Sequence, residues 1–148
     1  MSDFPDDNSF FGTLKFTQVG GVAVQYFNQT GEVSVRGTCV TITAPWTVGK
    51  VPIDVPNCIG IIDEDGKAIG AKVWVVIYGI APVLFTTSVT AGYLARTPLT
   101  GDAGGISGRA ISEPLPASPF SSDKHFCEIG HCVETGPAGL VNVNLHFN

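Results

Sequence analysis

Apolar and polar residues alternate strictly over the last eight positions of the chain, residues 141–148. Because successive side chains of a β-strand point to opposite faces, this period predicts a strand with one face in the core and the other towards water or a neighbour. The predicted core face holds Val141, Val143, Leu145 and Phe147, and the opposite face holds Asn142, Asn144, His146 and Asn148.

Short β-branched runs separated by glycine and proline continue this pattern upstream, and no stretch keeps a helical period for three turns. Residues 13–29 predict two strands with a bend or turn at Gly20-Gly21, and residues 31–42 predict a strand after a turn at Thr30-Gly31. The chain is therefore expected to be all-β.

Two apolar stretches in the middle of the chain sharpen this prediction. Residues 57–79 predict a hairpin with a solvated tip at 63–67, because Asp65-Gly66 suits a tight turn. The run 73–85 is interrupted by glycine and proline, which indicates a buried strand pair or one bent strand. At 13 residues it is too short to cross a bilayer as a helix, so we expect no membrane association.

Two segments lack strand character. The first is residues 1–12, an acidic arm broken by Pro5, and the second is residues 112–124, a Pro-rich excursion. Neither is expected to form a strand, because proline lacks the N–H that a sheet ladder needs. After the arm, we expect a single β domain over residues 13–148, which includes the Pro-rich excursion. The acidic start also lacks the basic and apolar pattern of a secretory signal, so we expect synthesis and retention in the cytosol.

Composition narrows the class of partner. Of 148 residues, 44% are hydrophobic and only 14% are charged, so part of the apolar surplus is expected in subunit interfaces. Thirteen acidic residues outnumber eight scattered basic ones, giving a net charge of −5. A nucleic-acid-binding surface needs clustered lysine and arginine, so DNA and RNA are not expected partners.

The four cysteines contain no C-x-x-C pair, and we expect them to be buried free thiols. The segment HFCEIGHC, residues 125–132, is favoured as a strand with His125, Cys127, Ile129 and His131 on one face. Cys127 and His131 would then lie about 13 Å apart, too far to share a zinc ion. If the same segment formed a helix, Cys127 and His131 would lie close together, because they are four positions apart. We expect no metal, cofactor or catalytic residue.

Two other polar segments carry no expected chemistry. The acidic run 63–65 lacks the ligand pattern of a calcium loop. The glycine-rich GDAGG, residues 101–105, lacks the following Lys-Ser/Thr of a phosphate cradle and predicts a turn. Among the tryptophans, Trp74 lies in the most apolar run and is expected in the core, whereas Trp46 beside a proline is a candidate interface anchor.

Residues 88–113, followed by HFCEIGHCVE and a closing alternating strand, resemble the small capsid cement, or decoration, proteins of tailed bacteriophages. The matching positions are Val89, Thr90, Ala91, Gly92 and Leu94, the turn 102–105, and Ile129, Gly130 and Glu134. The resemblance implies a barrel-like or tulip-like β domain that assembles as a homotrimer on the exterior of the virion. It implies the major capsid protein as partner and stabilisation of the capsid lattice as function.

The expected partner-binding residues follow from this role and from the two irregular arms. They are Phe4, Phe10, Phe11, Trp46 and Phe120. Two alternatives remain open at this stage. One is a capsid-displayed adhesion module that binds host glycans through exposed aromatic side chains, and the other is a cysteine- or metal-dependent enzyme that uses the C-terminal Cys/His cluster.

Overall fold

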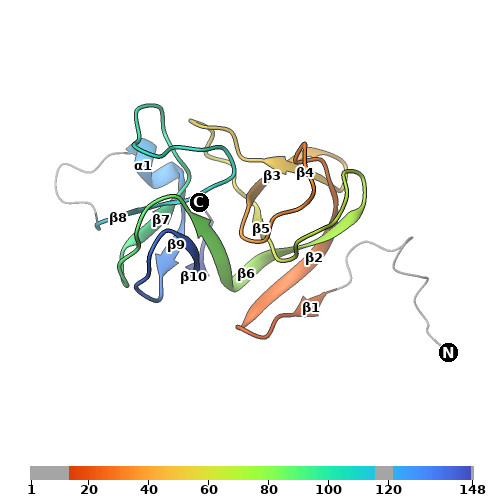
Figure 1. Ribbon diagram of the computed structural model, residues 1–148, viewed down its shortest axis with the longest axis horizontal. Coiled ribbons are helices and arrows are strands. Elements are labelled where there is room, and N and C mark those ends of the chain that lie inside the picture. Colours follow the sequence, from red (N-terminus) through yellow and green to blue (C-terminus); the bar gives the residue numbers. More distant parts are fainter. Residues whose placement is uncertain (1–13, 116–121, 148) are drawn as a thin grey trace.

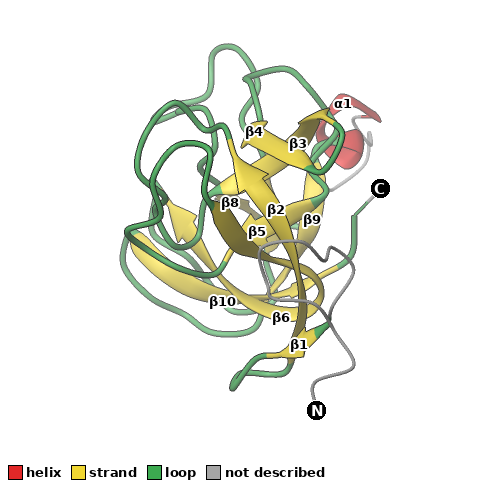
Figure 2. Ribbon diagram, turned by 90° about the vertical axis from the view of Figure 1, so that its right-hand side faces the viewer, coloured by secondary structure: helices red, strands yellow, loops and turns green. Residues whose placement is uncertain are grey.

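The computed structural model describes residues 14–115 and 122–147, and strands dominate it (Figure 1). One short helix, α1 (Ser122–Phe126), lies at the periphery of the strands (Figure 2). The ten strands are β1 (Lys15–Phe16), β2 (Gly21–Asn28), β3 (Cys39–Ala44), β4 (Thr47–Lys50), β5 (Gly60–Ile62), β6 (Lys72–Phe85), β7 (Leu94–Arg96), β8 (Ile111–Glu113), β9 (Glu128–Cys132) and β10 (Gly139–Leu145). The all-β prediction is confirmed. In the described part of the chain, no helix has the length and apolar character that a membrane crossing requires.

Five strands pair in a closed ring. The order β2-β4-β3-β5-β6 returns to its start because β6 also pairs with β2, in antiparallel register from Gly21↔Gly79 to Phe27↔Lys72. The β2–β4 pair is parallel, and the other four pairs in the ring are antiparallel. Closing the sheet gives each of these five strands a partner on both sides. The barrel-like expectation agrees with this ring.

Strand β1 pairs with β2, and the other four strands continue the sheet from the far half of β6, in the order β10-β9-β7-β8. This second set bends back towards β6, because Ala110, directly before β8, bridges to Phe85 at the end of β6. The backbone N–H of Ala110 also donates to the Leu84 carbonyl at 2.9 Å. Strand β6 therefore belongs to both halves of the molecule, as Figure 1 shows.

The shared strand β6 bends at Gly79, which confirms one of the two forms predicted for the apolar run 73–85. Gly79 has a φ of 82°, a value that glycine adopts without strain. A Cβ at this position would lie 2.3 Å from the Gly20 carbonyl oxygen. Glycine is therefore required both for the bend and for the close approach of the β1–β2 turn.

The larger of two hydrophobic clusters joins the two halves. It contains Cys39 and Ile61 from the ring, and Ile129 and Val143 from the second set of strands. The prediction that Trp74 packs in the core is supported, because its partly buried ring lies against this cluster. The smaller cluster fills one side of the ring and consists of Val40, Val48, Ile62, Val73 and Val75.

The closing strand and the first hairpin agree with the sequence predictions. In β10, Val141, Val143 and Leu145 are buried, whereas Asn144 and the following His146 are exposed. The segment 13–29 forms β1 and β2 in antiparallel pairing, joined by a turn that contains Gly20.

One upstream prediction needs correction. The strand expected over 31–42 begins only at Cys39, because residues 32–37 form a loop tied to the 63–67 tip. Its ties are the Ser34 hydroxyl, which donates to the Glu64 carbonyl, and the Arg36 N–H, which donates to the Asp65 carboxylate. The predicted solvated tip is supported, because residues 65–67 are exposed, and these two hydrogen bonds anchor it to the neighbouring loop.

The two segments after residue 111 also differ from expectation. Ser112 and Glu113 belong to strand β8, and residues 122–124 open helix α1, so both ends of the predicted Pro-rich excursion 112–124 have regular secondary structure. Residues 116–121 lie outside the described residues. The strand predicted from 125 begins at Glu128, because the Cys127 N–H donates to the Asp123 carbonyl and closes a helical turn first.

Candidate functional site

Most of the predicted partner-binding residues, namely Phe4, Phe10, Phe11 and Phe120, lie outside the described residues, as does the arm 1–12. Trp46 is described and occupies the exposed tip of the β3–β4 hairpin with a φ of 53°. Its ring is 5.8 Å from the ring of Tyr26, and its carbonyl accepts a hydrogen bond from the Phe27 N–H. The tip is therefore held in place with the indole partly open to solvent.

A second exposed aromatic group lies where β1, β2 and β6 run side by side. Phe16 pairs with Val22 on one side, and Val22 pairs with Tyr78 on the other. Directly paired residues share a face of the sheet, so these three side chains form one row. Phe16 is 80% exposed and Tyr78 is 71% exposed, which is unusual for large rings. We call Phe16, Val22 and Tyr78 the aromatic row.

The GDAGG turn binds a buried arginine. The side chain of Arg96 is only 4% exposed, and its guanidinium makes a bidentate pair with the Asp102 carboxylate at 2.6 and 2.9 Å. Its Nε donates to Glu113 at 2.6 Å, and Lys124 of helix α1 also pairs with Glu113. The same Asp102 carboxylate accepts the Leu99 N–H at 2.7 Å. The predicted turn is confirmed, and Asp102 fixes it to strands β7 and β8.

The pKa values of both acids follow from this network. The hydrogen bonds from Arg96 hold the pKa of Asp102 below its ordinary value. Burial alone would raise the pKa of Glu113, but the contacts with Lys124 and Arg96 outweigh it and lower the pKa. Both carboxylates therefore favour the charged state, as expected for members of a structural ion-pair network.

A further cluster arises from a bulge in β9. The pairing with β7 passes from Ala95↔Gly130 directly to Arg96↔Glu128, so Ile129 is an extra residue in β9. In a regular strand, Glu128 and His131 would face opposite sides because they are three positions apart. The extra residue brings both to the outer face while Ile129 enters the core.

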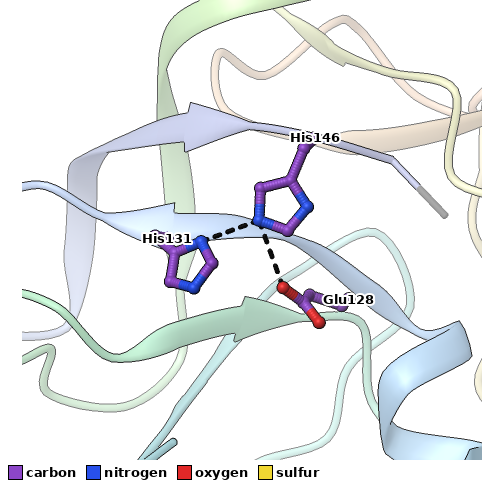
Figure 3. A group of neighbouring side chains, drawn as sticks. All are labelled: Glu128, His131 and His146. Atoms are coloured by element: carbon purple, nitrogen blue, oxygen red, sulfur yellow. Dashed lines mark hydrogen bonds and ion pairs between the residues drawn. The ribbon is translucent and has the colours of Figure 1, made fainter.

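The neighbouring strand supplies the third member of the cluster (Figure 3). The N–H of His146, just beyond β10, donates to the carbonyl of the bulged Ile129 at 3.0 Å. This bond places the His146 ring 4.7 Å from the ring of His131. His146 Nε2 lies 2.7 Å from His131 Nδ1 and 3.1 Å from Glu128 Oε1.

The prediction that residues 125–132 form one strand, with the two histidines, Cys127 and Ile129 on the same face, is wrong. His125 lies in helix α1, Ile129 and His131 face opposite ways, and Cys127 is not part of the group that contains His131. The signals for the cluster were present: an isolated glycine inside a strand pattern indicates a bulge, and His146 falls on the polar face of the last strand.

The four cysteines are buried and free, as predicted. A hydrogen bond with Cys58, added to burial, raises the pKa of Cys39 well above its ordinary value. Burial raises the pKa of Cys127 and Cys132 as well. The thiolate is the nucleophile, and a raised pKa lowers the fraction of thiolate. These thiols are therefore expected to have low reactivity.

Comparison of the chain with models of known protein families and with curated proteins finds no match. The function of the chain is therefore inferred from its own surfaces and clusters and from the motif resemblance.

Proposed function

We propose that this protein is a structural component of a virion that binds the exterior of a tailed-phage capsid as a trimer and stabilises the lattice of the major capsid protein. The observation that carries the proposal is the aromatic row, a set of large apolar side chains exposed in a chain with few charges. Aromatic side chains that give up water contribute most of the binding energy in many protein interfaces.

The position of the row fits this role. Phe16 lies on the short edge strand β1, two residues after the start of the described chain, and Leu14 beside it is also exposed. The arm 1–12, which carries three more phenylalanines, precedes this edge in the sequence. A partner that binds the arm would therefore meet the aromatic row next. The row and the arm together form one candidate interface.

The mechanism of stabilisation is mass action. A ligand that binds only the assembled shell stabilises the assembled state in proportion to the logarithm of its concentration over its dissociation constant. A trimer that engages three equivalent shell subunits raises the effective affinity of each modest contact. The protein needs no chemistry of its own for this function.

Substitution in the aromatic row tests the proposal. Phe16→Ser combined with Tyr78→Ser should weaken co-sedimentation with capsids that lack this protein by about tenfold or more, because each lost anchor costs about 1–2 kcal/mol. The matched control is Ile106→Ser, which removes an exposed apolar side chain from the long loop between β7 and β8. Equal capsid binding by the double variant and the control would overturn the assignment of this surface.

Truncation of the arm tests the other half of the interface. Deleting residues 1–11 should weaken capsid attachment and leave the thermal unfolding of the β domain unchanged. Undiminished capsid binding by the truncated chain would contradict a contribution from the arm. Binding by neither the truncated nor the intact chain would contradict the proposed function itself.

A further inference from the structure

We propose that Glu128, His131 and His146 form a binding site for a divalent transition-metal ion, with zinc as the preferred ion, on the outer face where β9 meets the C-terminal end of β10. One ligand atom from each residue lies within 4.8 Å of the others. Two of the side chains come from β9 and the third from the residue just beyond β10, and they converge as Figure 3 shows. This site does not depend on the proposed capsid function.

The hydrogen-bond chemistry of the cluster points to a cation. His146 Nε2 is within hydrogen-bond distance of both His131 Nδ1 and Glu128 Oε1. A neutral imidazole nitrogen either carries one proton or presents one lone pair, so it cannot make a full hydrogen bond to each neighbour. Three atoms with lone pairs directed at one region are satisfied together by a metal ion.

The charge of Glu128 leads to the same conclusion. Its side chain is only 7% exposed, and a buried carboxylate is costly unless a positive charge accompanies it. Within the described residues, its ion-pair partners are the imidazoles of His125 and His146, which carry charge only when protonated. Arg96, its partner in the strand register, directs its guanidinium to Asp102 and Glu113 instead. A divalent ion would supply the missing positive charge.

The donor set selects the class of metal. Two imidazole nitrogens and one carboxylate suit zinc and its neighbours, whereas calcium and magnesium prefer oxygen ligands. Tetrahedral zinc with bonds of about 2.0–2.1 Å needs ligand atoms about 3.3 Å apart. Two separations in the cluster, 2.7 and 3.1 Å, are close to this value, and all three ligand atoms lie within 4.8 Å of one another.

The surroundings complete the site on one side and leave it open on the other. His125 Nδ1 lies 3.3 Å from Glu128 Oε2, so a hydrogen bond there orients the carboxylate and leaves Oε1 for the metal. His131 is partly exposed and His146 is exposed, so the fourth coordination position faces solvent. In the isolated chain a water molecule would occupy this position, as it does in open zinc sites. A bound ion would tie the last residues of the chain to β9.

The test is zinc binding to the full-length protein after dialysis against a chelator. Isothermal titration calorimetry near pH 7.5 should give one zinc per chain, and the melting temperature should rise on addition of zinc. In His146→Gln, zinc affinity should fall at least tenfold and the rise in melting temperature should disappear. His146 is exposed, so this variant is expected to fold, which its melting curve without metal will show. It keeps all four cysteines, so the loss of binding would also exclude the thiols as zinc ligands.

A matched control and a second variant make the result decisive. Asn144→Ala changes the adjacent residue on the same exposed face of β10 and should bind zinc like the wild type. Glu128→Gln keeps the shape of the side chain but removes its charge and should lose binding as His146→Gln does. The proposal is overturned if the wild type binds no stoichiometric zinc, or if His146→Gln and Glu128→Gln bind it as tightly as the wild type.

Discussion

Replacing Arg96 with glutamine is expected to be among the most damaging single changes in the described chain. Arg96→Gln removes the guanidinium that binds Asp102 and Glu113, and it leaves two carboxylates close together around a buried position. Removing one partner of a buried ion pair costs about 3–5 kcal/mol. Water still reaches the acids, whose side chains are 20% and 21% exposed, so we expect the lower end, about 3 kcal/mol.

Chemical and thermal unfolding measure this loss. At about 2–4 °C per kcal/mol for a domain of this size, the melting temperature should fall by about 6–12 °C. The urea midpoint should fall without a change in the slope of the transition. Arg109→Gln is the matched control, because no described ion pair involves Arg109, and it should change stability by less than about 0.5 kcal/mol. A loss below about 1 kcal/mol for Arg96→Gln, or one equal to the control, would refute the structural role of this network.

Acidification from pH 7 to pH 3 should lower the melting temperature, because the folded-state pKa values of Asp102 and Glu113 are depressed. Their contribution is complete above the unfolded values of about 4 and is lost as the pH falls towards the folded values, and a pH-independent melting temperature would contradict it. Gly130→Ala should cost about 1–3 kcal/mol in urea unfolding, because the added Cβ would lie 2.2 Å from a backbone oxygen of β10. The control Gly136→Ala meets only an ordinary 3.4 Å contact, and equal midpoints for the two variants would contradict the argument. The four buried thiols should react with a disulfide reagent slowly in the native protein and fully after denaturation. Rapid labelling of even one native thiol would contradict their description as structural.

The local features of the fold follow from the sequence. Strict alternation was enough to locate β10 and to assign its inward face, because burial on one side of a strand imposes a period of two. The glycines at 20, 21 and 79 marked the turn before β2 and the bend in β6, since both need a backbone conformation that glycine adopts without strain.

The long-range features do not follow from any local period. Nothing in residues 94–96 distinguishes Arg96 from a surface arginine until the turn at Asp102 and strand β8 are placed on either side of it. The Glu128–His131–His146 cluster depends on one extra residue in β9, which shifts every following side chain to the opposite face. A straight strand assigned to 125–132 therefore gave the wrong face and hid the cluster.

We propose that this chain covers a capsid lattice, and the decisive measurement is its copy number in purified virus particles from its source. Quantitative mass spectrometry would give the ratio of this chain to the most abundant shell protein. A ratio near parity is the result that we predict for a lattice-covering trimer. Absence from the particles, or only a few copies in each, would contradict the claim.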